Sequence, residues 1–113
     1  MHELGITRNL VAIVSERAVG QKVLRVRLEV GRLSGVLVEA IRFCFHICSQ
    51  GTPLEGATLQ IVEVPGRGRC SACGAEPLLA APLGRCPACR EPSLRIVAGT
   101  ELKIVEMEVE SCV

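Results

Sequence analysis

The chain has 113 residues, 49% of them hydrophobic and only two aromatic, and its formal net charge at pH 7 is +1. This length suits one ordinary domain, or one small domain plus a metal-stapled module that is too small to hold a core of its own. The near-balance of charge and the scarcity of aromatic side chains argue against a nucleic-acid partner. No apolar run approaches the roughly 20 residues that a membrane span needs, so we expect a soluble protein without such a span.

Residues 4–19 predict an amphipathic helix near the start of the chain, and Gly20 supplies a stop signal. Its apolar side chains recur close to helical spacing and are Ile6, Leu10, Ile13, Val14 and Ala18. From residue 23 to residue 33 the chain instead alternates apolar and charged side chains, which is typical of a strand with one buried face. The face expected to be buried holds Leu24, Val26, Leu28 and Val30.

A second helix is predicted after Ser34, which can cap its N-terminus, and it ends before Gly51. Its buried stripe consists of Leu37, Ile41, Phe45 and Cys48. Residues 57–64 and 101–110 predict two further strands. In each of them the two-residue alternation changes phase partway, which indicates either a bulge or a strand covered on both faces. Because the two phase changes match, we expect these two strands to be neighbours in the sheet.

Two Cys-x-x-Cys pairs, Cys70/Cys73 and Cys86/Cys89, are separated by twelve residues. Two such turns facing each other present four thiolates to one tetrahedral zinc ion, at about 2.3 Å each. Gly74 suits a turn that needs a positive φ. A site closed by four cysteines leaves no open coordination position, so we expect the zinc to be structural rather than catalytic.

Two other interpretations of these cysteines are weaker. A pair of disulfides needs an oxidising compartment, whereas the chain opens Met1-His2-Glu3 with no signal-peptide pattern. A thioredoxin-like redox motif needs one Cys-x-x-Cys at the start of a helix, and here two lie in a segment rich in Gly and Pro. Thiolate ligands also favour a reducing compartment, so we expect a cytoplasmic protein.

Residues 65–68 and 97–100 are rich in Gly and Pro or small residues and bracket the cysteine segment, which therefore resembles an insertion. We predict an α+β fold, in which two helices pack on a small mixed three-stranded sheet and a four-Cys zinc-ribbon module is inserted. The predicted α/β domain comprises residues 1–65 and 100–113, and the zinc-binding module comprises residues 66–99. Within the module, residues 77–82 form a short apolar stretch, and Leu94, Ile96 and Val97 could pack under the metal site.

His2 is the second residue of the chain, so an α-amine, the His2 backbone nitrogen and imidazole Nδ1 could close adjacent chelate rings on one metal ion. Ni(II) and Cu(II) promote the required loss of an amide proton, and Zn(II) scarcely does. Glu3 could add a ligand through its amide nitrogen or its carboxylate. On composition alone, a histidine close to a chain end is usually just solvated.

Other reactive residues suggest no catalytic site. His46 lies between Cys44 and Cys48, but positions i, i+2 and i+4 of a helix do not share one face. The two cysteines, together with Phe43, therefore fit a core better than a ligand set. Cys112 has no assigned role. Neither a catalytic triad nor a phosphate-binding loop is recognisable, so we expect the protein not to be an enzyme.

The whole chain resembles the HypA/HybF family of hydrogenase nickel-incorporation proteins. The resemblance is carried by the opening Met1-His2-Glu3-Leu4, by residues 26–35, 39–43, 51–52 and 57–63, by Cys70-Ser71-Ala72-Cys73-Gly74 and Cys86-Pro87-Ala88-Cys89, and by residues 99–104. It implies that His2 is a principal ligand of Ni(II) carried as cargo, that Glu3 is an auxiliary one, and that Cys70, Cys73, Cys86 and Cys89 hold structural Zn(II).

The resemblance also implies a role in delivering nickel during maturation of [NiFe]-hydrogenase, and in some organisms of urease. The partners it implies are a nickel-handling maturation GTPase and the hydrogenase large-subunit precursor. Two alternatives stay open: a zinc-ribbon module that binds a partner without delivering nickel, and a thiol redox enzyme whose cysteine pairs cycle.

Overall fold

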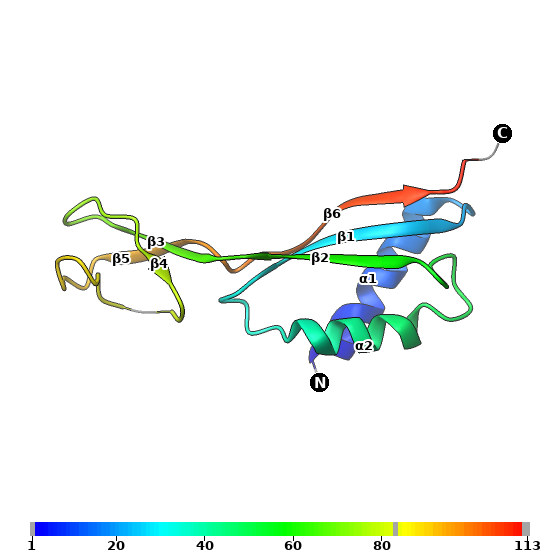
Figure 1. The fold of residues 1–113 in the computed structure, drawn as a ribbon, viewed down its shortest axis with the longest axis horizontal. Coiled ribbons are helices and arrows are strands. Elements are labelled where there is room, and N and C mark those ends of the chain that lie inside the picture. The colour runs from blue at the N-terminus through cyan, green and yellow to red at the C-terminus, as the bar shows by residue number, and fades with distance from the viewer. Residues whose placement is uncertain (1, 83, 112–113) are drawn as a thin grey trace. The chain divides into compact units, whose positions relative to one another are not determined.

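The computed structural model describes residues 2–82 and 84–111, in which two helices and six strands follow one another (Figure 1). In chain order they are α1 (His2–Ala18), β1 (Val23–Gly31), α2 (Val38–Cys48), β2 (Thr58–Val64), β3 (Gly66–Cys70), β4 (Leu78–Leu79), β5 (Leu94–Ala98) and β6 (Leu102–Val109). They form two three-stranded sheets with strand orders β2-β1-β6 and β4-β3-β5. The predicted α+β fold is confirmed.

The chain divides into two compact units. The first holds the described residues up to Glu29, Val36–Val62 and the residues from Lys103 onward, and the second holds Val30–Gly35 and Glu63–Leu102. Both helices belong to the first unit, and sheet β4-β3-β5 belongs to the second. Residues 66–99, predicted as the zinc-binding module, all lie in the second unit, which also includes residues outside that range. That nickel binds in the first part of the chain and zinc in the second stays a prediction.

β1 is the central strand of the first sheet. At the C-terminal ends of β1 and β2, Arg32 N–H donates to the Val64 carbonyl at 2.9 Å, so these strands run parallel. On the other side, Gly31 N–H donates to the Glu101 carbonyl at 2.6 Å and Glu110 N–H donates to the Lys22 carbonyl at 2.8 Å. This pairing of opposite ends makes β1 and β6 antiparallel.

The prediction that residues 57–64 and 101–110 form neighbouring strands is therefore wrong, because β1 separates β2 from β6. The cause is the connection through α2. A helical crossover returns the chain parallel to the strand it left, which sets β2 beside β1 and leaves the opposite edge of β1 for β6.

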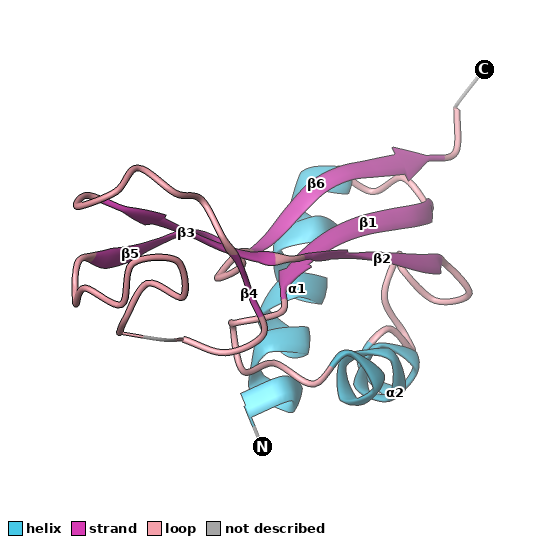
Figure 2. Cartoon of the chain, turned by 60° about the vertical axis from the view of Figure 1, so that its left-hand side comes forward, coloured by secondary structure: helices cyan, strands magenta, loops and turns pink. Residues whose placement is uncertain are grey.

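α1 lies against one face of sheet β2-β1-β6, with α2 beside it (Figure 2). The core of this unit is aliphatic apart from one phenylalanine, and it consists of Leu10, Val11, Val14, Ala18, Val23, Val26, Leu28, Ile41, Phe45 and Leu54. Three side chains predicted to be buried are exposed: Ile13 of α1 is 45% exposed, Leu24 of β1 is 40% exposed, and Leu37, which precedes α2, is 67% exposed. Instead of Ile13, the buried face of α1 includes the polar residues Glu3 and Thr7.

α2 is not capped by Ser34, contrary to the prediction. Its N-cap residue is Leu37, which makes no side-chain cap hydrogen bond. Ser34 lies in a turn after β1, where its N–H donates to the Gly31 carbonyl at 3.0 Å, and this turn places it too early to cap the helix. The stop signals hold, since Gly20 and Gly51 both have positive φ, of 80° and 75°.

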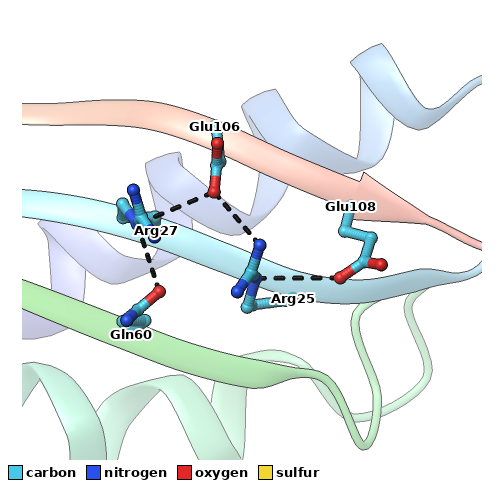
Figure 3. Close-up of polar contacts among 5 residues, drawn as sticks. All are labelled: Arg25, Arg27, Gln60, Glu106 and Glu108. Carbon is cyan, nitrogen blue, oxygen red and sulfur yellow. Dashed lines mark hydrogen bonds and ion pairs between the residues drawn. The ribbon is translucent and has the colours of Figure 1, made fainter.

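The outer face of the first sheet carries a cross-strand network of charged and polar side chains (Figure 3). Arg25 of β1 contacts Glu106 and Glu108 of β6 at 3.1 and 3.7 Å, and Arg27 contacts Glu106 at 3.6 Å and Gln60 of β2 at 3.1 Å. Opposite charges on neighbouring strands stabilise the pairing modestly.

The phase change expected in residues 101–110 is present in β6, because the consecutive residues Val105 and Glu106 are both exposed. In β2 the phase also changes, because Val62 and Glu63 are both exposed. Within the described residues, neither helix is long and apolar enough to cross a membrane.

Candidate metal centre

The two Cys-x-x-Cys turns of the second unit have the same backbone hydrogen bonds. In the first turn, Gly74 N–H donates to the Cys70 carbonyl at 2.9 Å, and in the second Arg90 N–H donates to the Cys86 carbonyl at 2.7 Å. Each first cysteine then donates its own N–H five residues ahead, from Cys70 to Ala75 at 2.9 Å and from Cys86 to Glu91 at 3.0 Å. The sequence repeats one local structure sixteen residues later.

The residue after each second cysteine has a positive φ. Gly74 has φ 76°, as predicted, and Arg90 has φ 67° at the equivalent place. Only glycine adopts this region without steric cost. The second turn therefore holds an arginine in a conformation that favours glycine, which the sequence did not reveal because a glycine is missing there.

These turns bring the four sulfur atoms together. All four Sγ atoms lie within 4.8 Å of one another, with Cys70–Cys89 at 3.6 Å and Cys73–Cys86 at 3.7 Å. A tetrahedral ion with four bonds of about 2.3 Å would hold its ligands about 3.8 Å apart, so the donor set fits one such ion. Disulfide bonds would need about 2.05 Å, and these cysteines are free thiols.

A small apolar cluster supports this site from within the second unit. A Cβ at Gly68 of β3 would lie 2.9 Å from Leu94 Cδ1 and 3.1 Å from Leu79 Cδ1, so both leucines pack on the glycine backbone. Leu79, from the apolar stretch 77–82, is 5% exposed. Val97 is 40% exposed, contrary to its predicted place under the metal site. It is the extra residue of β5 where the register shifts between Arg67 and Gly68.

The four thiols do not have equal acidities. Hydrogen bonds from the backbone N–H groups of Cys89 and Ala88 lower the pKa of the Cys86 thiol to about 7. The Glu91 backbone lowers the pKa of Cys89, but burial and the three neighbouring thiols outweigh it and raise that pKa to about 12. Four sulfur atoms this close cannot all ionise without a cation among them. The site is therefore built to be completed by a positive ion.

The predicted nickel residues lie at the start of α1, in the first unit. His2 is exposed, whereas Glu3 is buried, with 8% of its surface exposed. The Glu3 carboxylate accepts a hydrogen bond from Leu37 N–H at 3.0 Å, and this bond lowers the pKa of the Glu3 carboxyl. The Glu3 carbonyl accepts one from Thr7 Oγ1 at 2.6 Å. No local sequence pattern predicts the burial of Glu3, because its hydrogen-bond partner Leu37 lies 34 positions away in the chain.

Cys44, Cys48 and His46 belong neither to the four-cysteine cluster nor to the predicted nickel residues His2 and Glu3. His46 is exposed on α2, and Cys44 and Cys48 are half-buried on the same helix. Phe43, which we expected in the core with these cysteines, is 69% exposed. Cys112 lies outside the described residues.

The two units with their four-thiol cluster define a small metal-binding protein with an α+β domain and a ribbon-like module. A family model described as "Hydrogenase/urease nickel incorporation, metallochaperone, hypA" matches residues 1–109. The chain belongs to the HypA family.

Relatives and solved structures agree with this family. The chain is 57% identical over 110 residues to a hydrogenase maturation factor HypA of Rippkaea orientalis (97% of this chain, 96% of the relative) and 49% identical to one of Geobacter metallireducens (97% and 100%). A solution structure of HypA protein matches with a TM-score of 0.70 at 23% identity, covering 97% of both chains. That of the Ni metallochaperone HypA from Helicobacter pylori matches with a TM-score of 0.66 at 21% identity (95% and 96%). These two likenesses establish the fold.

Proposed function

We propose that this chain carries Ni(II) and delivers it during maturation of [NiFe]-hydrogenase, and that it transports the ion without catalysing a reaction. The observation that carries the proposal is the family match over residues 1–109. That family's description includes urease as well, but relatives 49% and 57% identical are named hydrogenase maturation factors, which supports hydrogenase as the client. We place this activity in the cytoplasm, where reduced thiols persist.

The ion of the four-cysteine site is proposed to be Zn(II) in a structural role. Thiolates and a tetrahedral arrangement favour zinc over nickel, which prefers nitrogen and oxygen donors in planar or octahedral geometry. Cys70, Cys73, Cys86 and Cys89 leave no position for a water or a substrate. Zinc bound there would hold the second unit together and would not be delivered.

Nickel is proposed to bind through His2, with Glu3 as an auxiliary ligand. The imidazole of His2 is exposed, so a partner protein can reach the ion and take it by ligand exchange. Backbone N–H groups in the first turn of a helix have no partner within the helix. The amide nitrogens of His2 and Glu3 can therefore serve the metal without breaking helical hydrogen bonds of α1. A carboxylate has enough lone pairs to bind a metal while it accepts from Leu37.

The partners proposed are a nickel-handling maturation GTPase, which would hand nickel on or receive it, and the precursor of the hydrogenase large subunit. Both proposed partners are proteins, so binding them requires no strongly basic surface of the kind that binds nucleic acid. The net charge of +1 is consistent with this.

The test is isothermal titration of the zinc-loaded full chain, with its natural amino end, with Ni(II). His2→Ala should weaken nickel binding by at least tenfold, on the order of the loss expected when a ligand or its orienting partner is removed. His46→Ala is the matched control, since His46 is also exposed and the chain has two histidines in all. Zinc content should be the same in all three proteins. If wild type and His2→Ala bound nickel with equal affinity, the nickel assignment would be rejected. The alternative, a zinc-ribbon module that binds a partner without delivering nickel, would then be favoured.

A further inference from the structure

Three arginines lie on one face of sheet β4-β3-β5. Arg69 of β3 is directly opposite Arg95 of β5 in the antiparallel pairing, so both side chains project from the same face. Arg67 precedes Arg69 by two residues and therefore shares that face. All three are exposed, while Gly66, Gly68 and Cys70 of β3 face inward and are buried. We call Arg67, Arg69 and Arg95 the arginine face.

The arginine face is only partly neutralised. Arg69 contacts Glu76 at 3.4 Å, and both side chains are about half exposed, at 54% and 45%. Within the residues that the structure describes, Arg67 and Arg95 have no ion pair. Of these three guanidinium groups, that of Arg69 is the one with a carboxylate partner among the described residues.

The first sheet of the same chain shows the opposite arrangement. There Arg25 of β1 faces Glu106 and Glu108 of β6, so arginines meet carboxylates across strands (Figure 3). Like charges directly opposite each other weaken a strand pair. The pairing of Arg69 with Arg95 therefore weakens this strand pair, and an anion bound beside the two guanidinium groups would offset the repulsion.

We propose that the arginine face is a docking surface for an acidic segment of a partner protein, bound in extended form along β5. Charge complementarity selects an anionic occupant, because guanidinium groups bind carboxylates through paired hydrogen bonds. β5 is an edge strand of its sheet, so an added strand can pair with it. Carboxylates at every second residue of such a segment would face Arg95 and reach Arg69.

A protein segment fits this surface better than a nucleic acid does. Stacking of bases requires aromatic side chains, and both aromatic residues of the chain, Phe43 and Phe45, lie on α2. The proposal is independent of nickel binding, because none of the three arginines lies in the unit that contains His2.

The test measures fluorescence anisotropy of a labelled ten-residue peptide of alternating Glu and Thr, added to the zinc-loaded full chain. The expected result is binding that weakens as the NaCl concentration rises. A peptide with Gln in place of Glu should bind at least about tenfold more weakly, since it lacks the charges. Arg95→Glu should weaken binding of the acidic peptide by a similar factor.

Arg95→Glu is a favourable variant, because its carboxylate faces Arg69 and replaces a like-charge pair by an attractive one. It should keep its zinc content and should unfold at the same temperature as wild type or higher. Arg8→Glu is the matched control, since it changes the net charge equally on an exposed residue of α1. The control should bind the acidic peptide as wild type does.

Four results would overturn the proposal: no binding of the acidic peptide at low salt, equal binding of the Glu and Gln peptides, equal loss in Arg95→Glu and Arg8→Glu, or tighter binding of single-stranded oligonucleotides than of the peptide. Light scattering adds a fifth. If the chain dimerises, and the dimer is abolished by Arg95→Glu and excludes the peptide, the occupant is a second copy.

Discussion

The Glu3 carboxylate, next to the proposed nickel ligand His2, accepts a hydrogen bond of 3.0 Å from the backbone N–H of Leu37, the N-cap residue of α2. Leu37 itself provides no capping side chain. The carboxylate thus meets the positive end of the helix dipole of α2 from another part of the chain. The start of α1 is thereby tied to the start of α2, and Glu3 serves the fold whether or not it binds nickel.

We expect Glu3→Ala to destabilise the first unit and Glu3→Gln to destabilise it less, because the Gln side chain keeps an acceptor for Leu37 N–H but loses the charge. Urea unfolding followed by circular dichroism at 222 nm checks this, since both helices belong to that unit. Equal stability of Glu3→Ala and wild type would show that the bond contributes nothing in solution.

The same contact should depend on pH. The Leu37 hydrogen bond lowers the pKa of Glu3 below 4.5 in the folded state, so the unfolded state binds the proton more readily. The stability that the charge contributes is therefore complete above pH 4.5 and is lost as the pH falls through the lowered folded-state pKa. The difference in unfolding free energy between wild type and Glu3→Gln should be constant from pH 6 to 8 and should shrink below about pH 4.5. A difference that grows on acidification would contradict this assignment.

The features that the sequence predicted correctly depend on local patterns. The alternation of Val26, Leu28 and Val30 predicts the buried face of β1, and the Cys-x-x-Cys spacing predicts the sulfur cluster, because each pattern is repeated within a few residues. Features that depend on pairing between distant residues were missed. The burial of Glu3, the separation of β2 from β6 and the meeting of Arg69 with Arg95 all follow from strand order and register, which no local pattern contains.

The two cysteine turns provide a matched pair of substitutions. Gly74→Ala places a side chain at φ 76° and should cost about 1 kcal/mol, whereas Arg90→Gly relieves a side chain at φ 67° and should stabilise the module by about as much. Both changes should alter zinc affinity about fivefold, in opposite directions. Competition with a chromophoric chelator measures this. If Arg90→Gly weakened zinc binding as much as Gly74→Ala, the two turns would not be equivalent in solution.

Binding of zinc should release protons near pH 7.5. Against the hydrogen bond from Ala75, burial and the Cys70 and Cys86 thiols raise the pKa of Cys73 above 9.0, and the pKa of Cys89 is raised to about 12. Both thiols are therefore protonated at this pH and must ionise to bind the metal. We expect at least two protons per zinc, and an apparent affinity that falls about a hundredfold for each unit of acidification. Titration calorimetry in buffers of different ionisation enthalpy counts the protons, and release of fewer than two would contradict the site.

The charged network on the outer face of the first sheet should contribute little. Glu106→Gln removes contacts with Arg25 and Arg27, but these side chains are 37–45% exposed, so the loss should be about 0.5 kcal/mol and should nearly vanish in 1 M NaCl. Thermal unfolding at two salt concentrations tests this. A loss above about 2 kcal/mol, or one that salt leaves unchanged, would show that Glu106 acts through something other than these ion pairs.

Gly31, at the end of β1, should tolerate no side chain. A Cβ there would overlap the carbonyl group of Gly99 and would lie 2.6 Å from Thr100 N, and all of these atoms are backbone that cannot turn aside. Gly31 N–H also donates to the Glu101 carbonyl at 2.6 Å, so the two segments cannot separate without losing that bond. We expect Gly31→Ala to destabilise the chain by at least about 2 kcal/mol.

Gly5→Ala is the control for this substitution. Gly5 lies in α1 with nothing within 4 Å of an added Cβ, so alanine there should be neutral or should stabilise the helix by up to about 1 kcal/mol. Thermal unfolding of the zinc-loaded proteins should therefore move Tm downward for Gly31→Ala and leave it unchanged or higher for Gly5→Ala. A Gly31→Ala protein as stable as wild type would mean that the backbones of residues 31 and 99 lie further apart in solution than in this structure.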